Sequence, residues 1–172
     1  MGLEFSNNLE ELERIEKLKN KVFKFIVYKK RTEKEVRDKF KSEIDEDLLD
    51  EIIDYMKEQK YLDDEDYIDR FVKEMMNLKN TSIKDITYKL MGKGINSNLI
   101  DDYICKNYET MIEYEVRSAK NIYLKKKDKS EDEEIRNYLF RKGFSSDSVS
   151  RGIEEGKEVL IRGRSNTKFR IN

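Results

Sequence analysis

The chain of 172 residues contains no histidine, no proline and a single cysteine, Cys105. Without histidine it cannot form a Ser-His or Cys-His catalytic couple or a histidine-ligated metal site, so catalysis would need carboxylates alone. One cysteine excludes an internal disulfide and predicts a reducing, cytoplasmic environment. Its neighbour Ile104 on a predicted helix indicates a buried or half-buried thiol. We therefore expect a protein that is not an enzyme.

Long hydrophobic runs and phosphate-binding glycine motifs are also absent. No apolar run approaches the ~20 residues of a membrane span, and neither GxGxxG nor GxxxxGK[ST] occurs. Charged residues make up 42% of the chain and hydrophobic residues 37%, which favours helices with solvated outer faces around thin cores. The net charge of −1 does not support a uniformly basic nucleic-acid binder.

Residues 61–104 have the pattern of a three-helix unit. Apolar residues recur every three or four positions after Asp64, which predicts an amphipathic helix whose first turn Asp63 or Asp64 caps. A shorter helix is predicted from Ser82 to the glycines at 92–94, since glycine adopts the conformation that ends helices. Asn96 or Ser97 then caps a third helix. The apolar stripe of the first helix comprises Tyr67, Ile68, Phe71, Val72, Met75 and Met76.

The same pattern occurs twice more. Downstream positions match at an offset of about 49 residues and upstream positions at about 50 or 51. The sequence therefore predicts an all-α fold, an elongated array of three tandem three-helix repeats; the alternative is a chance alignment of apolar positions. The predicted segments are a disordered N-terminus (1–10), repeat one (11–60), repeat two (61–106), repeat three (107–155) and a basic C-terminal tail (156–172), which either extends the last helix or is disordered.

Charge is unevenly distributed along the chain. Basic residues dominate from Arg14 to Lys41, acidic residues from Glu43 to Glu74, and basic residues again after Arg117 and in the tail. This distribution suggests an elongated partner of mixed charge. The alternative is that these helices simply carry solvated charged faces.

The basic residues supply the candidate binding site. Arg31, Lys34 and Arg37 lie three or four residues apart, with Lys41 beyond them, so all four share one helix face. They could pair with acidic groups of a partner or reach a phosphate; the alternative is intrachain pairing with the acidic middle segment. The candidate partner-binding residues are Lys30, Arg31, Lys34, Arg37, Lys41, Arg117, Lys120, Lys125, Lys126, Lys127, Arg141 and Lys142.

The other polar and aromatic clusters are predicted to be structural. The acidic residues at 63–66 and 69 are explained by helix-start electrostatics, so no metal, cofactor or catalytic residue is predicted. Phe140 is expected at the edge of a core. Five tyrosines are expected to pack against apolar faces: Tyr55, Tyr67, Tyr88, Tyr103 and Tyr123.

Three motifs together resemble the RecX family, bacterial regulators of the recombinase RecA. The segment Lys30-Arg31-Thr32-x-x-Glu35-Val36 resembles the first-repeat motif of that family. Residues 61–72, YLDDEDYIDRFV, resemble its most recognisable stretch, and the Lys-Gly-apolar turns at 93–95 and 142–144 resemble its repeated turn. The match covers roughly residues 14 to 155.

The resemblance implies a fold of tandem three-helix repeats and a non-enzymatic modulator, mainly an inhibitor, of RecA. Such a protein would bind as a monomer along the groove of the RecA filament on single-stranded DNA, with roles in DNA repair, recombination and the SOS response. The first alternative is a helical-repeat adaptor that binds another protein. The second alternative is a direct binder of single-stranded nucleic acid. A weak direct contact with DNA is also compatible with the role of RecA modulator.

Overall fold

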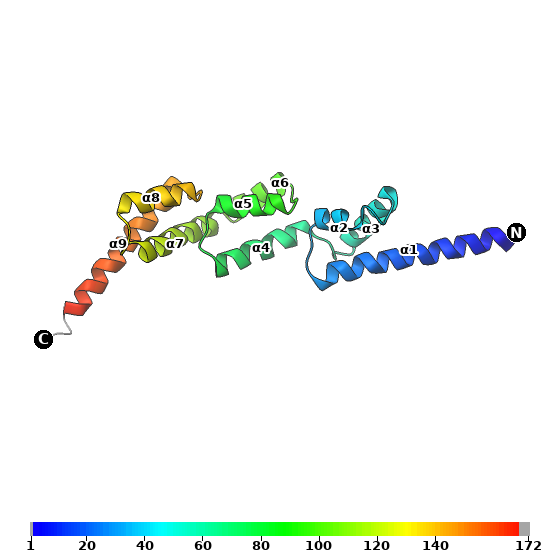
Figure 1. Ribbon diagram of the computed structural model, residues 1–172, viewed down its shortest axis with the longest axis horizontal. Helices are drawn as coiled ribbons and strands as arrows, with labels where there is room; N and C mark the ends of the chain where they lie inside the picture. The colour runs from blue at the N-terminus through cyan, green and yellow to red at the C-terminus, as the bar shows by residue number, and fades with distance from the viewer. Residues whose placement is uncertain (1, 169–172) are drawn as a thin grey trace. The chain divides into compact units, whose positions relative to one another are not determined.

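The computed structural model describes the backbone of residues 2–168 and the side chains of residues 9–163. Within that range every regular element is a helix, as the sequence predicts (Figure 1). The helices are α1 (Gly2–Tyr28), α2 (Glu33–Phe40), α3 (Glu46–Glu58), α4 (Asp64–Leu78), α5 (Ile83–Gly92), α6 (Ser97–Lys106), α7 (Tyr108–Lys126), α8 (Asp132–Arg141) and α9 (Ser146–Lys168). None of these helices is both long and apolar enough to span a bilayer.

The chain forms two compact units. The first comprises residues 1–68 and 92–96, and the second comprises residues 69–91 and 97–172. The first unit therefore contains α1, α2, α3, the first turn of α4 and the turn that follows α5. The second contains the rest of α4 and α5 together with α6, α7, α8 and α9.

The core of the first unit is built from the apolar stripes of α1, α2 and α3. Phe25 and Phe40 meet edge to face, with ring centroids 5.5 Å apart. Leu62 closes the cluster just before α4 begins. The buried members are Val22, Ile26, Val36, Phe40, Ile44, Leu49, Ile52, Ile53, Met56 and Leu62.

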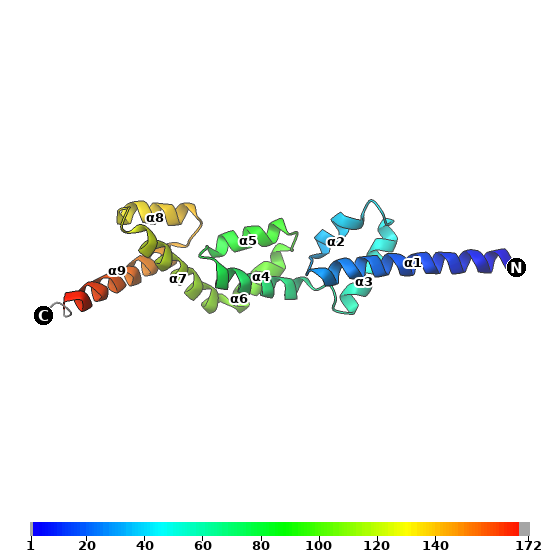
Figure 2. The same ribbon diagram turned by 60° about the horizontal axis from the view of Figure 1, so that its bottom comes forward.

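The second unit is organised around the packing of α7 on α9 (Figure 2). Gly152 of α9 allows this close approach, because a Cβ there would lie 2.7 Å from the Cβ of Ala119 and 2.9 Å from the backbone oxygen of Val116. Gly156 similarly leaves room for the ring of Tyr123. The buried cluster consists of Ala119, Tyr123, Ile135, Leu139, Phe144, Val149 and Ile153.

Side-chain caps fix several helix starts, including the one that the sequence predicts at Asp63. Thr32 and Glu35 form a reciprocal capping box at the start of α2, and the Asp45 carboxylate accepts from the Asp47 amide at the start of α3. Asp63 caps α4 by accepting from the backbone amides of residues 65 and 66 at 3.0 and 3.1 Å. Gly94, with φ of +81°, provides the left-handed turn after α5.

The terminal segments differ from the prediction. Helix α1 begins at Gly2, so residues 2–10 are helical rather than disordered, because extending a formed helix through good helix formers such as Leu9 and Glu10 is inexpensive. The tail was expected either to extend the last helix or to be disordered, and in the structure it extends α9 as far as Lys168. Met1 and residues 169–172 lie outside the described residues, as do the side chains of Arg164, Lys168 and Arg170.

Several predicted core positions are exposed. Cys105 is exposed rather than buried, because α6 buries its opposite side through Ile100. Tyr55 and Tyr88 are 43% and 60% exposed. Both lie outside the buried stripes of their helices, which include Met56 in α3 and Ile86 and Leu90 in α5.

Candidate partner-binding surfaces

The predicted basic residues fall into two groups, one in each unit. Lys30, Arg31, Lys34, Arg37 and Lys41 belong to the first unit, and the remaining seven belong to the second. The groups differ in how many of their charges are already paired with carboxylates of the same unit.

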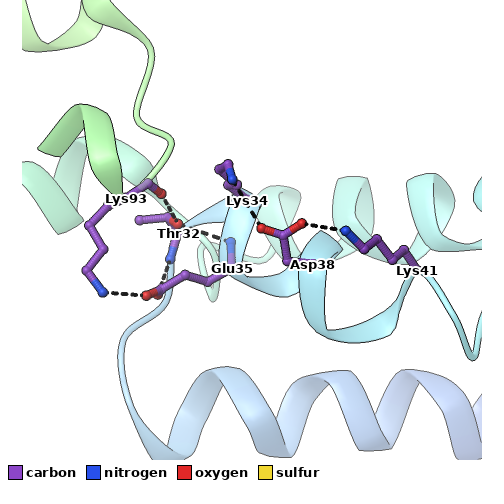
Figure 3. Close-up of polar contacts among 6 residues, drawn as sticks. All are labelled: Thr32, Lys34, Glu35, Asp38, Lys41 and Lys93. Carbon is purple, nitrogen blue, oxygen red and sulfur yellow. Dashed lines mark hydrogen bonds and ion pairs between the residues drawn. The ribbon is translucent and has the colours of Figure 1, made fainter.

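In the first unit the basic face of α2 is neutralised by carboxylates. Arg37 donates to Glu33 at 2.8 Å and to Asp50. Lys34 and Lys41 lie on either side of Asp38, at 3.2 and 3.0 Å (Figure 3). Intrachain pairing, the alternative weighed from the sequence, is therefore the arrangement found for these cations.

The same pairing continues into the acidic middle segment. Lys30 pairs with Asp66 at 3.0 Å, and Lys57 pairs with Glu33. Burial raises the pKa of Glu33, but hydrogen bonds from Lys57 and Arg37 outweigh it and hold that pKa below its ordinary value. Hydrogen bonds from Lys41 and Lys34 also lower the pKa of Asp38. These carboxylates consequently remain ionised and offset the positive charge of α2.

The guanidinium of Arg31 packs on an aromatic side chain of the first unit instead of extending into solvent. Its guanidinium carbon lies 4.4 Å from the ring centroid of Phe25, within cation–π range. Its Nε is buried and has no hydrogen-bond partner within the described part of the chain. Arg31 therefore serves packing at least as much as recognition.

A polar network fixes the turn at Lys93 to the start of α2. The hydroxyl of Thr32 donates to the carbonyl oxygen of Lys93 at 2.7 Å, and the ammonium of Lys93 donates to Glu35 at 2.7 Å (Figure 3). Burial raises the pKa of Glu35, but the bonds from Lys93 and from the Thr32 amide lower it overall. The Lys-Gly turn therefore has a structural role.

In the second unit two of the predicted cations are paired. Lys120 binds Glu155 at 2.8 Å, and Lys127 binds Asp132 at 2.7 Å. Lys157 binds the same Asp132 at 2.5 Å, and the pKa of that carboxyl is lowered by the hydrogen bonds from Lys127 and Lys157. Both predicted cations thus tie neighbouring helices of this unit together.

The other five cations of the second unit form no salt bridge among the described residues. Lys126 and Lys142 both lie over the ring of Tyr138, with ammonium nitrogens 4.1 and 5.9 Å from its centroid. Arg117 lies 5.7 Å over the ring of Tyr114. Lys125 and Arg141 are exposed to solvent. Positive charge without a salt bridge therefore lies at the middle and the C-terminal end of α7 and at the C-terminal end of α8.

Sequence reasoning missed two carboxylates that cap distant helices. Asp64 accepts from the backbone amide of Glu33 at 3.1 Å. Glu115, only 1% exposed, accepts from the amide of Ile83 at 2.9 Å and from the hydroxyl of Ser145 at 2.7 Å. Asp64 and Glu115 are 51 residues apart, which is close to the repeat period and could have marked them as equivalent positions. Neither residue is apolar, however, so the repeat of apolar positions did not include them.

The acidic residues do not gather into a metal site. Within the described residues, no three carboxylate or thiol side chains are placed to hold one ion. Asp63 is engaged in capping, and Asp66 pairs with Lys30. The described part of the chain therefore belongs to the class of all-helical proteins, with both ion-paired and unpaired charges on its surface.

Comparison with known proteins gives the family. A regulatory protein RecX of Clostridium acetobutylicum is 30% identical over 146 residues, which are 80% of this chain and 67% of the relative. A regulatory protein RecX of Oceanobacillus iheyensis is 29% identical, over 86% of this chain and 56% of the relative. No family model matches the chain.

Solved structures agree with these relatives. The crystal structure of RecX from Lactobacillus salivarius is 30% identical, with a TM-score of 0.73, over 85% of this chain and 98% of that chain. The chain belongs to the RecX family. It spans between about half and two thirds of the length of the two curated relatives, both of which are named regulatory proteins.

Proposed function

We propose that this chain is a non-enzymatic modulator, mainly an inhibitor, of RecA recombinase, and that it binds as a monomer along the groove of the RecA–DNA filament. The observation that supports this proposal is membership of the RecX family, with 30% identity to a regulatory protein RecX and to a RecX crystal structure. Such a regulator acts by binding its partner protein, and charged helix faces can bind a partner without catalytic groups.

We also propose that the chain is built of three tandem three-helix repeats, with bounds near 11–60, 61–106 and 107–155. Equivalent contacts recur about 50 residues apart in support of this. Thr32 donates to the carbonyl of Lys93, and Ser82 donates to the carbonyl of Lys142 at 2.8 Å. A filament repeats one surface at regular intervals, so a protein made of similar units is suited to binding along it.

The test is the DNA-dependent ATPase activity of a cognate RecA, titrated with this protein. We expect inhibition well below one copy per RecA monomer, because a few bound molecules would act on a long polymer. The absence of any effect at equimolar protein, with helical folding established by circular dichroism, would reject the proposal.

Within this proposal the α2 face contacts the recombinase. Reversing the charges of Arg31, Arg37 and Lys41 should weaken filament binding, but loss of Arg37 would also break its pairs with Glu33 and Asp50. Lys34→Glu with Lys41→Glu is the sharper variant, because both side chains are more than half exposed and, among the described residues, form salt bridges only with Asp38. Unaltered filament binding by this double variant would exclude the α2 face as a contact.

A further inference from the structure

A pocket of about 330 Å³ lies in the first unit, where α1, α3 and the turn that follows α3 meet. It shares no residue with the α2 face, and its lining combines aromatic rings with charged and polar side chains. Its volume is near the lower end of the ~300–1,000 Å³ that ligand sites span, so it has room for one or two side chains and not for a large cofactor. The lining residues are Glu16, Lys19, Asn20, Phe23, Tyr55, Met56 and Tyr61.

A left-handed turn after α3 places one aromatic wall of this pocket. Lys60 has a φ of +58°. The amides of Tyr61 and Leu62 both donate to the Met56 carbonyl, at 2.9 and 3.1 Å, which ends the helix and reverses the chain. The ring of Tyr61 then meets Phe23 of α1 edge to face, with centroids 4.8 Å apart. Backbone bonds and ring packing therefore hold this wall, and the pocket is formed before a ligand binds.

The two tyrosine rings of the pocket favour a cationic ligand group. Tyr55 is 43% exposed and Tyr61 is 41% exposed, so both rings are accessible from solvent. The ammonium of Lys19 lies 5.2 Å from the centroid of the Tyr55 ring, so a cation already lies against this wall. The face of an aromatic ring carries negative charge density and attracts cations, arginine more often than lysine.

Carboxylates without salt bridges surround these rings. Glu16 lines the pocket and forms no salt bridge within the described part of the chain. Glu51 and Glu58 lie four residues before and three residues after Tyr55, so they share its face of α3. Both are exposed, and neither forms a salt bridge with any described residue. Lys19 is the single cation in the described lining, so the surface lacks positive charge that a partner can supply.

An arginine within a polypeptide fits this combination of rings and carboxylates. A guanidinium is planar and weakly hydrated, so it can stack on a tyrosine ring while its N–H groups donate to a carboxylate such as Glu16. A lysine ammonium is compact and strongly hydrated, and it stacks less well. A free arginine would make few contacts in so open a pocket, whereas a protein segment also places neighbouring residues against Glu51 and Glu58.

We propose that this pocket docks an arginine side chain of a partner protein, with the guanidinium against Tyr55 and Tyr61 and paired with Glu16. The first unit then has a protein-binding site in addition to the α2 face assigned to the recombinase. The inference rests on the pocket and its charges alone and does not depend on the proposed function. RecA inhibition is decided separately by the ATPase titration, so the two proposals can fail independently.

The experiment follows the backbone amide NMR signals of the full, isotope-labelled chain during titration with the acetylated and amidated tripeptide Ala-Arg-Ala. Saturable shifts at millimolar peptide should concentrate at residues 16–23 and 55–61, which contain the lining. Two further tripeptides replace the arginine, one with citrulline, which keeps the shape without the charge, and one with lysine. Both should bind about threefold more weakly or worse, because they lose the charge or the planar, stacking group.

Two variants remove parts of the pocket, and each has a matched control. Glu16→Gln is compared with Glu13→Gln, which removes the same charge where Glu13 pairs with Lys17 at 3.9 Å. Tyr55→Leu is compared with Tyr28→Leu, because Tyr28 is 89% exposed and lies outside the lining. Each pocket variant should bind the arginine peptide about threefold more weakly, and the controls should bind it as the wild type does. Circular dichroism verifies that all four variants fold.

Other outcomes would overturn the arginine site. Equal affinity for the citrulline peptide would mean that the charge is not recognised, and equal affinity for the lysine peptide would mean that any cation suffices. Equal losses in the pocket and control variants, or the absence of saturable shifts, would remove the pocket from the interaction. Tighter binding of the tripeptide Ala-Leu-Ala would assign the pocket to an apolar side chain. Shifts at the same residues that depend on protein concentration without peptide would assign it to a second copy of the chain.

Discussion

The hydroxyl of Thr32 donates to the backbone carbonyl of Lys93, 61 residues later in the chain, over 2.7 Å. The same oxygen accepts from the Glu35 amide at 3.2 Å, so one buried side chain both starts α2 and binds the turn after α5. Ser82 does the same in the second unit, where it accepts from the Asp85 amide at 3.1 Å and donates to Lys142. A small hydroxyl residue is required at both positions because it must donate and accept in a space closed to water.

Replacing Thr32 with valine should destabilise the first unit by about 2–3 kcal/mol. Valine keeps the shape but removes the helix cap, worth ~1 kcal/mol, and leaves the Lys93 carbonyl without its partner, which costs ~1–3 kcal/mol when buried. Urea denaturation followed by circular dichroism measures the loss. Thr110→Val is the matched control, because Thr110 is exposed. Equal stabilities of the two variants would contradict this role of the hydroxyl.

Gly94 should tolerate substitution far less well than Gly92. Its φ of +81° disfavours any residue with a Cβ, and that Cβ would lie 2.0 Å from Cδ and 2.4 Å from Cβ of Lys34. Gly94→Ala should therefore cost about 2–3 kcal/mol, from the backbone conformation and the overlap together. At Gly92 a Cβ would meet nothing within 4 Å outside its own helix, so Gly92→Ala should be neutral or stabilising by up to ~1 kcal/mol. Thermal unfolding of the pair compares them, and similar losses at both positions would contradict the expectation.

Tyr103 should be among the last tyrosines to ionise. Burial, together with its hydrogen bond of 3.1 Å to Asp69, raises its pKa to about 12. Because this folded-state pKa lies above the unfolded value of about 10, the stability it contributes is complete below pH 10 and is lost as the pH rises through 12. An absorbance titration of phenolate formation should show a late component that disappears in Tyr103→Phe. The control is Tyr88→Phe, in which the late component should remain because Tyr88 is 60% exposed. If the late component also remained in Tyr103→Phe, its assignment to Tyr103 would be wrong.

Local signals in the sequence predicted much of this fold. The spacing of apolar residues after Asp64 gave the stripe of α4 that buries Ile68 and Val72, because a helix must turn its apolar residues to one side. Asp63 gave a helix start, and Gly94 a helix end, because both depend on backbone geometry within a few residues.

The candidate site was less predictable, because it depends on contacts between distant segments. Arg37 and Arg117 look alike in the sequence, yet Arg37 is paired with Glu33 and Asp50 while Arg117 lies over the ring of Tyr114. Which cation is compensated is decided by the residues that the fold brings near it. Asn80 and Asn121 lie 41 residues apart, and nothing local to either indicates that they meet.

Glu115 offers the most demanding test of these distant contacts. Its two carboxylate oxygens accept from the start of α5 at Ile83 and from the start of α9 at Ser145, so one buried side chain satisfies amides of two helices. Glu115→Gln replaces one acceptor oxygen with an NH2 group that faces one of those donors, and a buried donor left unsatisfied costs about 1–3 kcal/mol. We expect the second unit to lose about 2–3 kcal/mol of stability and its α5 and α9 amides to exchange faster with deuterium. Glu113→Gln, two residues away on the exposed side of α7, should change neither quantity. If amide exchange at Ile83 and Ser145 were unaltered in Glu115→Gln, the carboxylate would not be the group that holds these helix ends.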